Sequence, residues 1–411
     1  MSARQVADAV NAARLLESIE ALAAFGARDD GGVDRPALGE RDIEARRFLI
    51  DRARALGCSV HVDACANLFF RREGDAALAP VMTGSHIDTQ PAGGKLDGCY
   101  GVLAGFEVLA ALNDANVPTR RPLEVAIWTN EEGTRFSPGA MGSSAFVEPS
   151  RMARYAHVQD AEGTTLSAAL QRHVSAFPEL PPRAQQDAAH AFVELHIEQG
   201  PQLEKAEVPL AVVSGIQGVR WYAFHVQGIA AHAGTTPMPL RRDAMTLAIA
   251  LHRELDVIAH ELGRADTRVT FGRWNIAPNS INTIPSAVSF TVDFRHPDAR
   301  VLGAFDEHAQ AIAQSHGARI EALFAHAPVA FNPSVLSRID EACRALDTRA
   351  LHLTSGAFHD AMYLAKHCPS GMIFVPSIDG ISHNPAEATD AGPLVLGARA
   401  LAHCLTTLCN D

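Results

Sequence analysis

The stretch GSHIDTQPAGGKLDG, Gly84–Gly98, carries one histidine, two aspartates and a lysine among four glycines. It follows the apolar run APVMTG, which predicts a short buried strand. Glycine lets the backbone turn sharply and lets other atoms come close, while imidazoles and carboxylates are common ligands of divalent metals. The stretch therefore predicts a strand that ends in a functional loop, with His86, Asp88 and Asp97 as the candidate groups.

The segments around this loop alternate between helices and strands. GVLAGFEVLAALNDANV (101–117) predicts a helix, and PLEVAIWTNEEG (122–133) and HAFVELHIEQGPQLE (190–204) predict strands that end on polar residues. This alternation is typical of an α/β domain. Because ligands of α/β sheets bind beyond the carboxyl ends of the strands, we expect these polar residues to meet there.

A different order begins near Val213. The following segments predict β-α-β-β-α-β, the ferredoxin-like order, in which TRVTFGRWNI (267–276) forms one strand. Helix–strand alternation returns after Pro333, so we expect a domain at 213–330 inserted into a domain made of 1–212 and 331–411. At the amino terminus, MSARQVADAVNAARLLESIEALAAFG (1–26) predicts one amphipathic helix rather than a signal sequence.

Composition narrows the class of protein. The 411 residues carry a net charge of −12 and no long basic run, which argues against nucleic acid as a partner. We see no apolar run near membrane-spanning length, so we expect no membrane contact. The seven cysteines are scattered without a CxxC pair, which favours a reducing cytoplasm over a disulfide framework or a thiolate zinc site.

The polar strand ends together suggest a metal centre. They supply His86, Asp97, the pair Glu131–Glu132, His196 and, in GISHNPAE, His383. Three histidines with two or more carboxylates suit two metals about 3.5–4 Å apart that share one bridging carboxylate. Each group alone has a simpler interpretation: a histidine at a surface, a turn aspartate or a solvated acidic turn. Asp88 is either a cap or a carboxylate that orients a ligating imidazole.

The adjacent glutamates need different roles. Successive side chains of extended backbone point in opposite directions, so one can bind a metal while the other stays free. A free carboxylate beside an activated water is a natural general base, which would later return the proton to the leaving nitrogen.

Segments in chain order over nearly the whole length resemble the hydantoinase/carbamoylase amidases of the M20 metallopeptidase superfamily. They are GSHIDTQPAGGKLDGCYGVLAGFEVL, WTNEEGTRF, HIEQGPQLE, AAHAGTTPMPLRRDA, PNSINTIPSAV, DFRH and GISHNPAE. The resemblance implies a two-metal catalytic domain of the aminopeptidase-like α/β fold with an inserted lid that dimerises. It implies His86, Asp97, Glu132, His196 and His383 as metal ligands, Asp97 as the bridge and Glu131 as the base.

The same resemblance implies that Gln199, His232, Asn282 and Arg295 bind substrate. A guanidinium holds a carboxylate through a two-pronged contact, and the imidazole could donate to a developing oxyanion. The alternatives are a surface salt bridge for the arginine, a capping or packing role for the histidine, and turn stabilisation for the two amides. Phe358, in SGAFHDA, stands where the family often has glycine. The resemblance therefore does not determine which side chain the preferred substrate carries.

The predicted function is hydrolysis of an N-carbamoyl-L-amino acid or N-carbamoyl-β-alanine to amino acid, ammonia and carbon dioxide by a cytoplasmic homodimer. The oxygen and imidazole ligands suit two zinc, manganese, cobalt or nickel ions per chain. Allantoate or ureidoglycolate hydrolysis is the first alternative, and an aminoacylase or dipeptidase is the second. A further class is a non-catalytic module that holds structural metal. Glu131 argues against this class, because a binding module needs no free base beside its metal site.

Overall fold

The computed structural model describes residues 2–183 and 189–411. The chain forms two compact units: one contains residues up to 214 together with 330–411, and the other contains 215–329.

The first unit is built on a nine-stranded sheet. Along the sheet the strands are β1 (Ser59–Val62), β2 (Leu68–Arg72), β4 (Leu123–Trp128), β3 (Val81–His86), β5 (Ala191–Ile197), β14 (Ser370–Val375), β6 (Leu210–Ile216) and β12 (Val329–Ala330), and β13 (Ala350–Ser355) pairs with β6. Strands β4, β3, β5 and β14 run parallel and are buried along their whole length. Burial on both faces is the usual state of a parallel sheet covered by helices, and this confirms the α/β class.

Helices on both faces account for this burial. One apolar core joins the sheet to α1 (Ser2–Asp8), α2 (Ala12–Ala23), α3 (Glu40–Ala55), α4 (Cys99–Asp114), α11 (Pro333–Ala345) and α13 (Ala391–Asn410). A smaller cluster joins α5 (Met141–Val147), α6 (Arg151–Tyr155) and α7 (Leu166–Ala176). The short helices α8 (Gln202–Ala206), α12 (Ala361–Leu364) and η3 (Ile378–Gly380) lie in the loops after β5, β13 and β14.

Two expectations about helices were wrong. The amino-terminal segment is two helices, because the side chain of Asn11 accepts the amide of Arg14 and starts a new helix there. α13 has the length and hydropathy to cross a membrane, contrary to the reading that no run approached that length. Most of that helix is buried against α1, α4 and α11, as in the core of a soluble domain.

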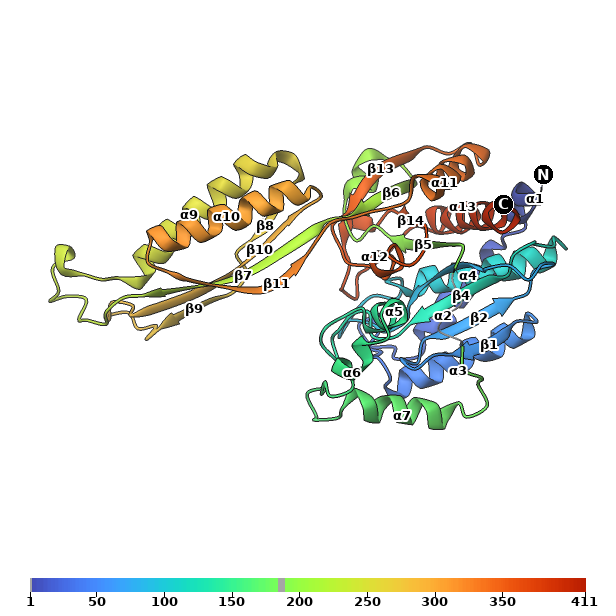
Figure 1. Ribbon diagram of the computed structural model, residues 1–411, viewed down its shortest axis with the longest axis horizontal. Coiled ribbons are helices and arrows are strands. Elements are labelled where there is room, and N and C mark those ends of the chain that lie inside the picture. Colours follow the sequence, from blue (N-terminus) through green and yellow to red (C-terminus); the bar gives the residue numbers. More distant parts are fainter. Residues whose placement is uncertain (1, 184–188) are drawn as a thin grey trace. The chain divides into compact units, whose positions relative to one another are not determined.

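The second unit is an antiparallel sheet with two helices on one face (Figure 1). In chain order it contains β7 (Gly218–Gln227), η1 (Met238–Leu240), α9 (Ala244–Gly263), η2 (Arg264–Asp266), β8 (Arg268–Thr270), β9 (Trp274–Ala277), β10 (Ala287–His296), α10 (Ala299–Ser315) and β11 (Arg319–His326). Burial alternates along β10, which places Phe290 and Phe294 against the helices in the core. The segment 267–276 is two short strands rather than one, and both pair with β10.

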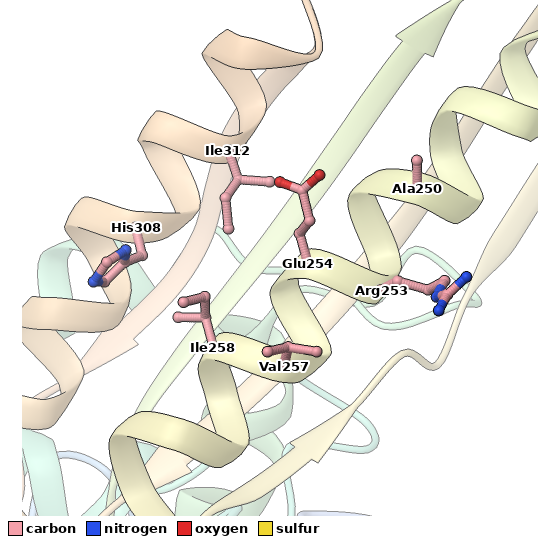
Figure 2. A pocket seen from close by; sticks show the side chains of 7 residues that line it. All are labelled: Ala250, Arg253, Glu254, Val257, Ile258, His308 and Ile312. Atoms are coloured by element: carbon pink, nitrogen blue, oxygen red, sulfur yellow. The ribbon is translucent and has the colours of Figure 1, made fainter.

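A shallow groove lies between α9 and α10 (Figure 2). Val257, Ile258 and Ile312 give it an apolar floor, while Arg253, Glu254 and His308 supply polar groups. The side chains of Ile249 and Val257, both on α9, are each about half exposed. This unit therefore presents apolar surface that its own core does not cover.

Candidate metal centre

The parallel strands bring the polar strand ends to one edge of the sheet. His86 is the last residue of β3 and is in register with Trp128, the last residue of β4, which leads into Glu131 and Glu132. His196 is the last residue but one of β5, the neighbour of β3 on the other side. This shared edge is where α/β folds bind their ligands.

Asp97 is the centre of this cluster. Its Oδ1 lies 3.2 Å from His196 Nε2 and 3.9 Å from His86 Nε2, while its Oδ2 lies 3.1 Å from His383 Nε2. His383 Nε2 is in turn 3.7 Å from Glu132 Oε2. Three groups with metal-ligand geometry result. Two of them, His86–Asp97–His196 and Asp97–Glu132–His383, share Asp97, and we call these two the ligand groups; the third is Glu194–His196–His359.

The backbone aims two imidazoles at Asp97. His86 Nδ1 donates to the carbonyl of Asp88 at 2.8 Å, and His196 Nδ1 donates to the carbonyl of Ile197 at 2.9 Å. A carbonyl can only accept, so both Nε2 atoms are left to face the aspartate. Gly98 makes room for this arrangement, because it has a φ of 65° and a Cβ there would lie 2.4 Å from the His86 ring.

The carboxylate of Asp88 supports the two glutamates and does not hold an imidazole as expected, because His86 Nδ1 lies 3.9 Å from Asp88 Oδ1 and bonds the backbone carbonyl of Asp88 instead. Its carboxylate accepts the backbone amides of Glu131 and Glu132, each at 3.2 Å. Glu132 is held further by Gln90, whose backbone amide and side-chain amide donate to its two oxygens at 3.0 and 2.7 Å. Glu131 Oε2 lies 3.6 Å from His86 Nε2, and its side chain is 10% exposed. Glu132 therefore belongs to a ligand group and Glu131 lies beside one, which is the arrangement that different roles for the two glutamates require.

The charges of the cluster depend on one another. Burial raises the pKa of Glu131 well above its usual range, and it raises the pKa of Glu132 to about 7 with a further contribution from Asp97. Burial alone would also raise the pKa of Asp97, but hydrogen bonds from His196 and His383 hold it well below the usual value. Carboxylates crowded in a buried site favour a bound cation, which removes their mutual repulsion.

Gln199 joins the centre, whereas the other predicted substrate residues belong to the second unit. Gln199 Nε2 donates to Asp97 Oδ2 at 3.1 Å and to Ser382 Oγ at 3.2 Å. In the second unit, the backbone carbonyl of Asn282 accepts the amide of Ala233, so the loops carrying His232 and Asn282 are adjacent, and both residues are exposed.

Arg295 lies at the opposite end of β10 from those two loops. Ala287 starts that strand, which is joined to the loop of Asn282, and Arg295 is its last residue but one. The guanidinium forms a two-pronged ion pair with Asp293 at 2.8–3.1 Å. The alternative interpretation of Arg295 was a surface salt bridge, and the structure contains one, with Asp293.

Several supporting residues were missed by sequence reasoning. The ring of His359 lies 4.5 Å from that of His196, and its Nε2 lies 3.0 Å from Ser355 Oγ. Glu194 points to the same face of β5 as His196 and accepts Ser85 Oγ at 2.7 Å. Fully buried Arg35 donates to the carbonyl of Ile87 at 2.7 Å and so fixes the loop after β3. The motif SGAFHDA was the one signal for His359, and Phe358 is half buried directly before it.

This donor set fits two divalent ions. Each of the two groups that share Asp97 offers three ligand atoms within 4.8 Å of one another, all of them imidazole nitrogen or carboxylate oxygen. Such donors suit borderline and hard metals. The shared aspartate is the feature expected of a bridged pair.

Comparisons with known proteins agree with this fold. Residues 82–407 match the model of peptidase family M20/M25/M40. An amidase of the hydantoinase/carbamoylase family from Burkholderia multivorans has a solved structure that superposes with a TM-score of 0.92, at 40% identity over 98% of each chain. These matches identify the chain as a hydrolase that acts on linear amide C–N bonds.

The chain belongs to peptidase family M20/M25/M40, and within it to the hydantoinase/carbamoylase amidases. The N-carbamoyl-L-amino acid amidohydrolase of Geobacillus stearothermophilus is 38% identical over 96% of this chain and 98% of its own length. The allantoate amidohydrolase of Escherichia coli (strain K12) is 35% identical over 95% of this chain and 97% of its own.

Proposed function

We propose that the protein hydrolyses N-carbamoyl amino acids, with N-carbamoyl-L-amino acids or N-carbamoyl-β-alanine as substrates. The observation that carries this proposal is the pair of ligand groups sharing Asp97, with Glu131 beside them. The 38% identity to an N-carbamoyl-L-amino acid amidohydrolase over nearly the full length supports the substrate class. His86 and His196 would hold one ion, Glu132 and His383 the other, and Asp97 both.

When bound, the two ions would polarise the carbamoyl oxygen and lower the pKa of a nearby water. Glu131 takes one proton from the water as its oxygen bonds to the carbamoyl carbon. Glu131 then gives that proton to the leaving nitrogen, and the C–N bond breaks. The carbamic acid that remains releases carbon dioxide, so the products are amino acid, ammonia and carbon dioxide.

The proposed substrate contacts divide between the two units. Gln199 beside the metal centre would bind the ureido group, His232 would donate to the oxyanion, Asn282 would bind the ureido group, and Arg295 would hold the carboxylate. For Arg295 this requires the guanidinium to leave Asp293 or to share it, which a substrate carboxylate can drive because the pair is partly exposed.

The geometry of the second unit favours a dimer in which two chains build each site. β10 separates Ala287 from Arg295 by eight residues, roughly 26 Å at 3.3 Å per residue. That span exceeds the length of a carbamoyl amino acid, so Arg295 and the loops of His232 and Asn282 would reach one substrate only from different chains. The apolar surface around the groove in Figure 2 supports the second unit as the dimerisation surface and lid.

A cytoplasmic location is in keeping with the cysteines, all seven of which are free and buried. The first alternative substrate is allantoate or ureidoglycolate, which the 35% identical allantoate amidohydrolase supports. These substrates share the ureido group and carboxylate, so the same residues would bind them. Phe358, half buried, would either narrow the pocket for the substrate's side chain or pack behind it, so the panel also has to establish which side chain is preferred.

The test is a substrate panel run with each candidate metal. Metal-free protein is loaded separately with zinc, manganese, cobalt or nickel. Ammonia release is measured from N-carbamoyl-L-alanine, its D-enantiomer, N-carbamoyl-β-alanine and allantoate, and acetate release is measured from an N-acetyl amino acid. We expect the highest kcat/KM for a carbamoyl amino acid. A higher value for allantoate would establish the alternative, and hydrolysis of the N-acetyl compound alone would indicate an aminoacylase.

A further inference from the structure

We propose that Glu387 is a positioning residue that fixes Asp97 and His383 relative to one another, an inference that rests on the proposed metal centre. Glu387 lies in neither ligand group. It is 4% exposed and belongs to the loop between β14 and α13, whereas Asp97 belongs to the loop before α4. The two loops are almost 300 residues apart in the chain, and the side chain of Glu387 connects them.

Each oxygen of Glu387 serves one of the two loops. Oε1 accepts the backbone amides of Leu96 and Asp97, both at 3.0 Å. Oε2 accepts the hydroxyl of Ser382 at 2.7 Å, and Ser382 directly precedes His383. These three donors connect the carboxylate to both loops, and Glu387 itself belongs to none of the groups with metal-ligand geometry.

The loop that carries His383 needs such support. His383 has a φ of 55°, which is uncommon for a residue with a side chain. The side chain of His383 is 49% exposed, so packing alone does not fix it. The bond from Ser382 to Glu387 therefore supplies a constraint that burial does not.

The glycine-rich loop contains independent evidence for the position of Glu387. A Cβ added to Gly94 would lie 2.1 Å from Glu387 Oε1 and 2.3 Å from its Cδ, and its three nearest neighbours are all atoms of this one side chain. Gly94 does not have a positive φ, so its backbone does not require glycine. We infer that Gly94 lacks a side chain because the carboxylate of Glu387 lies against it.

This geometry predicts that two different substitutions have the same effect. Glu387→Ala leaves the amides of Leu96 and Asp97 without their acceptor, and Gly94→Ala pushes the carboxylate away from them. Loss of a group that supports metal ligands typically costs 10–100-fold in metal affinity. In the double variant the added methyl no longer meets a carboxylate, although the Cβ that alanine keeps at position 387 would still lie 2.5 Å away. The second change should therefore add less than its effect in the wild-type background.

The experiment measures zinc affinity by competition with a chromophoric chelator and counts bound ions by elemental analysis. The proteins are wild type, Glu387→Ala, Glu387→Gln, Gly94→Ala, the double alanine variant and Gly93→Ala. Gly93 is the matched control, because a Cβ there would lie 3.1 Å from the nearest atom, the carbonyl oxygen of Gln90. Thermal unfolding of each metal-free protein reports stability separately from metal binding.

We expect Glu387→Ala and Gly94→Ala to lose zinc affinity about equally, by about 10–100-fold, and the double variant to lose less than the two losses combined. Glu387→Gln should keep most of it, since the amide oxygen still accepts both amides, and Gly93→Ala should match wild type. If Glu387→Ala does not fold, the contrast between Gly94→Ala and Gly93→Ala decides. Wild-type affinity in Glu387→Ala or in Gly94→Ala, or losses that add in the double variant, would overturn the proposal. Wild-type protein that binds fewer than two ions would instead refute the metal centre itself.

Discussion

The division of labour between Glu131 and Glu132 can be tested by two substitutions that preserve shape. Glu131→Gln removes the proposed base but no ligand, because Glu131 lies in neither ligand group. The backbone amides bound by Asp88 are unchanged, so the loop should keep its form. Loss of a general acid–base group lowers turnover by about 10²–10⁴, or about 2.7–5.5 kcal/mol in the barrier. Both ions should remain bound.

Glu132→Gln should give the opposite pattern. The substitution removes a charged ligand. In the wild type, Gln90 donates hydrogen bonds to both carboxylate oxygens of Glu132, and the amide nitrogen of the variant cannot accept one of them. Metal affinity should fall by at least about 10–100-fold, the cost of losing a group that only supports a ligand. The assay combines bound-metal analysis with turnover at saturating metal, and Glu148→Gln in an exposed position serves as control. Metal loss in Glu131→Gln with full occupancy in Glu132→Gln would refute the assignment.

The other predictions concern the bridge, the carboxylate contact and acid stability. Asp97→Ala should lose both ions and nearly all activity, since Asp97 belongs to both ligand groups; two tightly bound ions in that variant would exclude a bridge. Arg295→Ala should lose about 10- to 150-fold in kcat/KM, the equivalent of 1.5–3 kcal/mol for a charge-assisted hydrogen bond, and should discriminate poorly between a carbamoyl amino acid and its carboxamide. Arg295→Lys should also be impaired, because an ammonium lacks the planar fork. Burial, and then Arg46, lower the pKa of His173 to about 3 from 6.5. The unfolded chain therefore binds the extra proton as pH falls below about 6.5, and stability should fall by about 3 kcal/mol between pH 7 and pH 4. The free energy of unfolding, measured with urea at each pH, should lack this loss of about 3 kcal/mol in His173→Leu.

The sequence was informative where chemistry follows directly from chain position. Polar residues directly after apolar strands could be assigned to one sheet edge, because parallel strands end on the same side. This placed His86, Glu131, Glu132 and His196 near one another, and the structure brings them together. The fold class followed from the same alternation.

Supporting groups were harder to predict because their role depends on distant partners. Glu387 and Arg35 look like ordinary loop residues in the sequence, and only the fold shows the backbone groups that they bind. The spacing of apolar residues also does not reveal local breaks in a helix or strand. Asn11 divides the first helix although the apolar spacing continues through it, and a break at Phe271–Arg273 divides the expected strand into β8 and β9.

The proposal that two chains build each substrate site leads to a complementation experiment. Glu131→Gln disables the chemistry of its own chain but leaves His232 intact, and His232→Ala does the reverse. If His232 acts on the site of the partner, a mixed dimer contains one site with a normal base and a normal imidazole.

Random exchange makes about half of the dimers mixed, each with one working site, so activity should recover to about one quarter of wild type. Subunits are exchanged in mild denaturant and refolded, and each variant treated alone is the control. If His232 serves its own chain, no mixed dimer has a complete site and the mixture stays as inactive as its parents. Full wild-type activity from a strictly monomeric protein at micromolar concentration would also refute the two-chain site. Either result would require Arg295 and His232 to act at different stages or on different molecules, because the length of β10 keeps them apart within one chain.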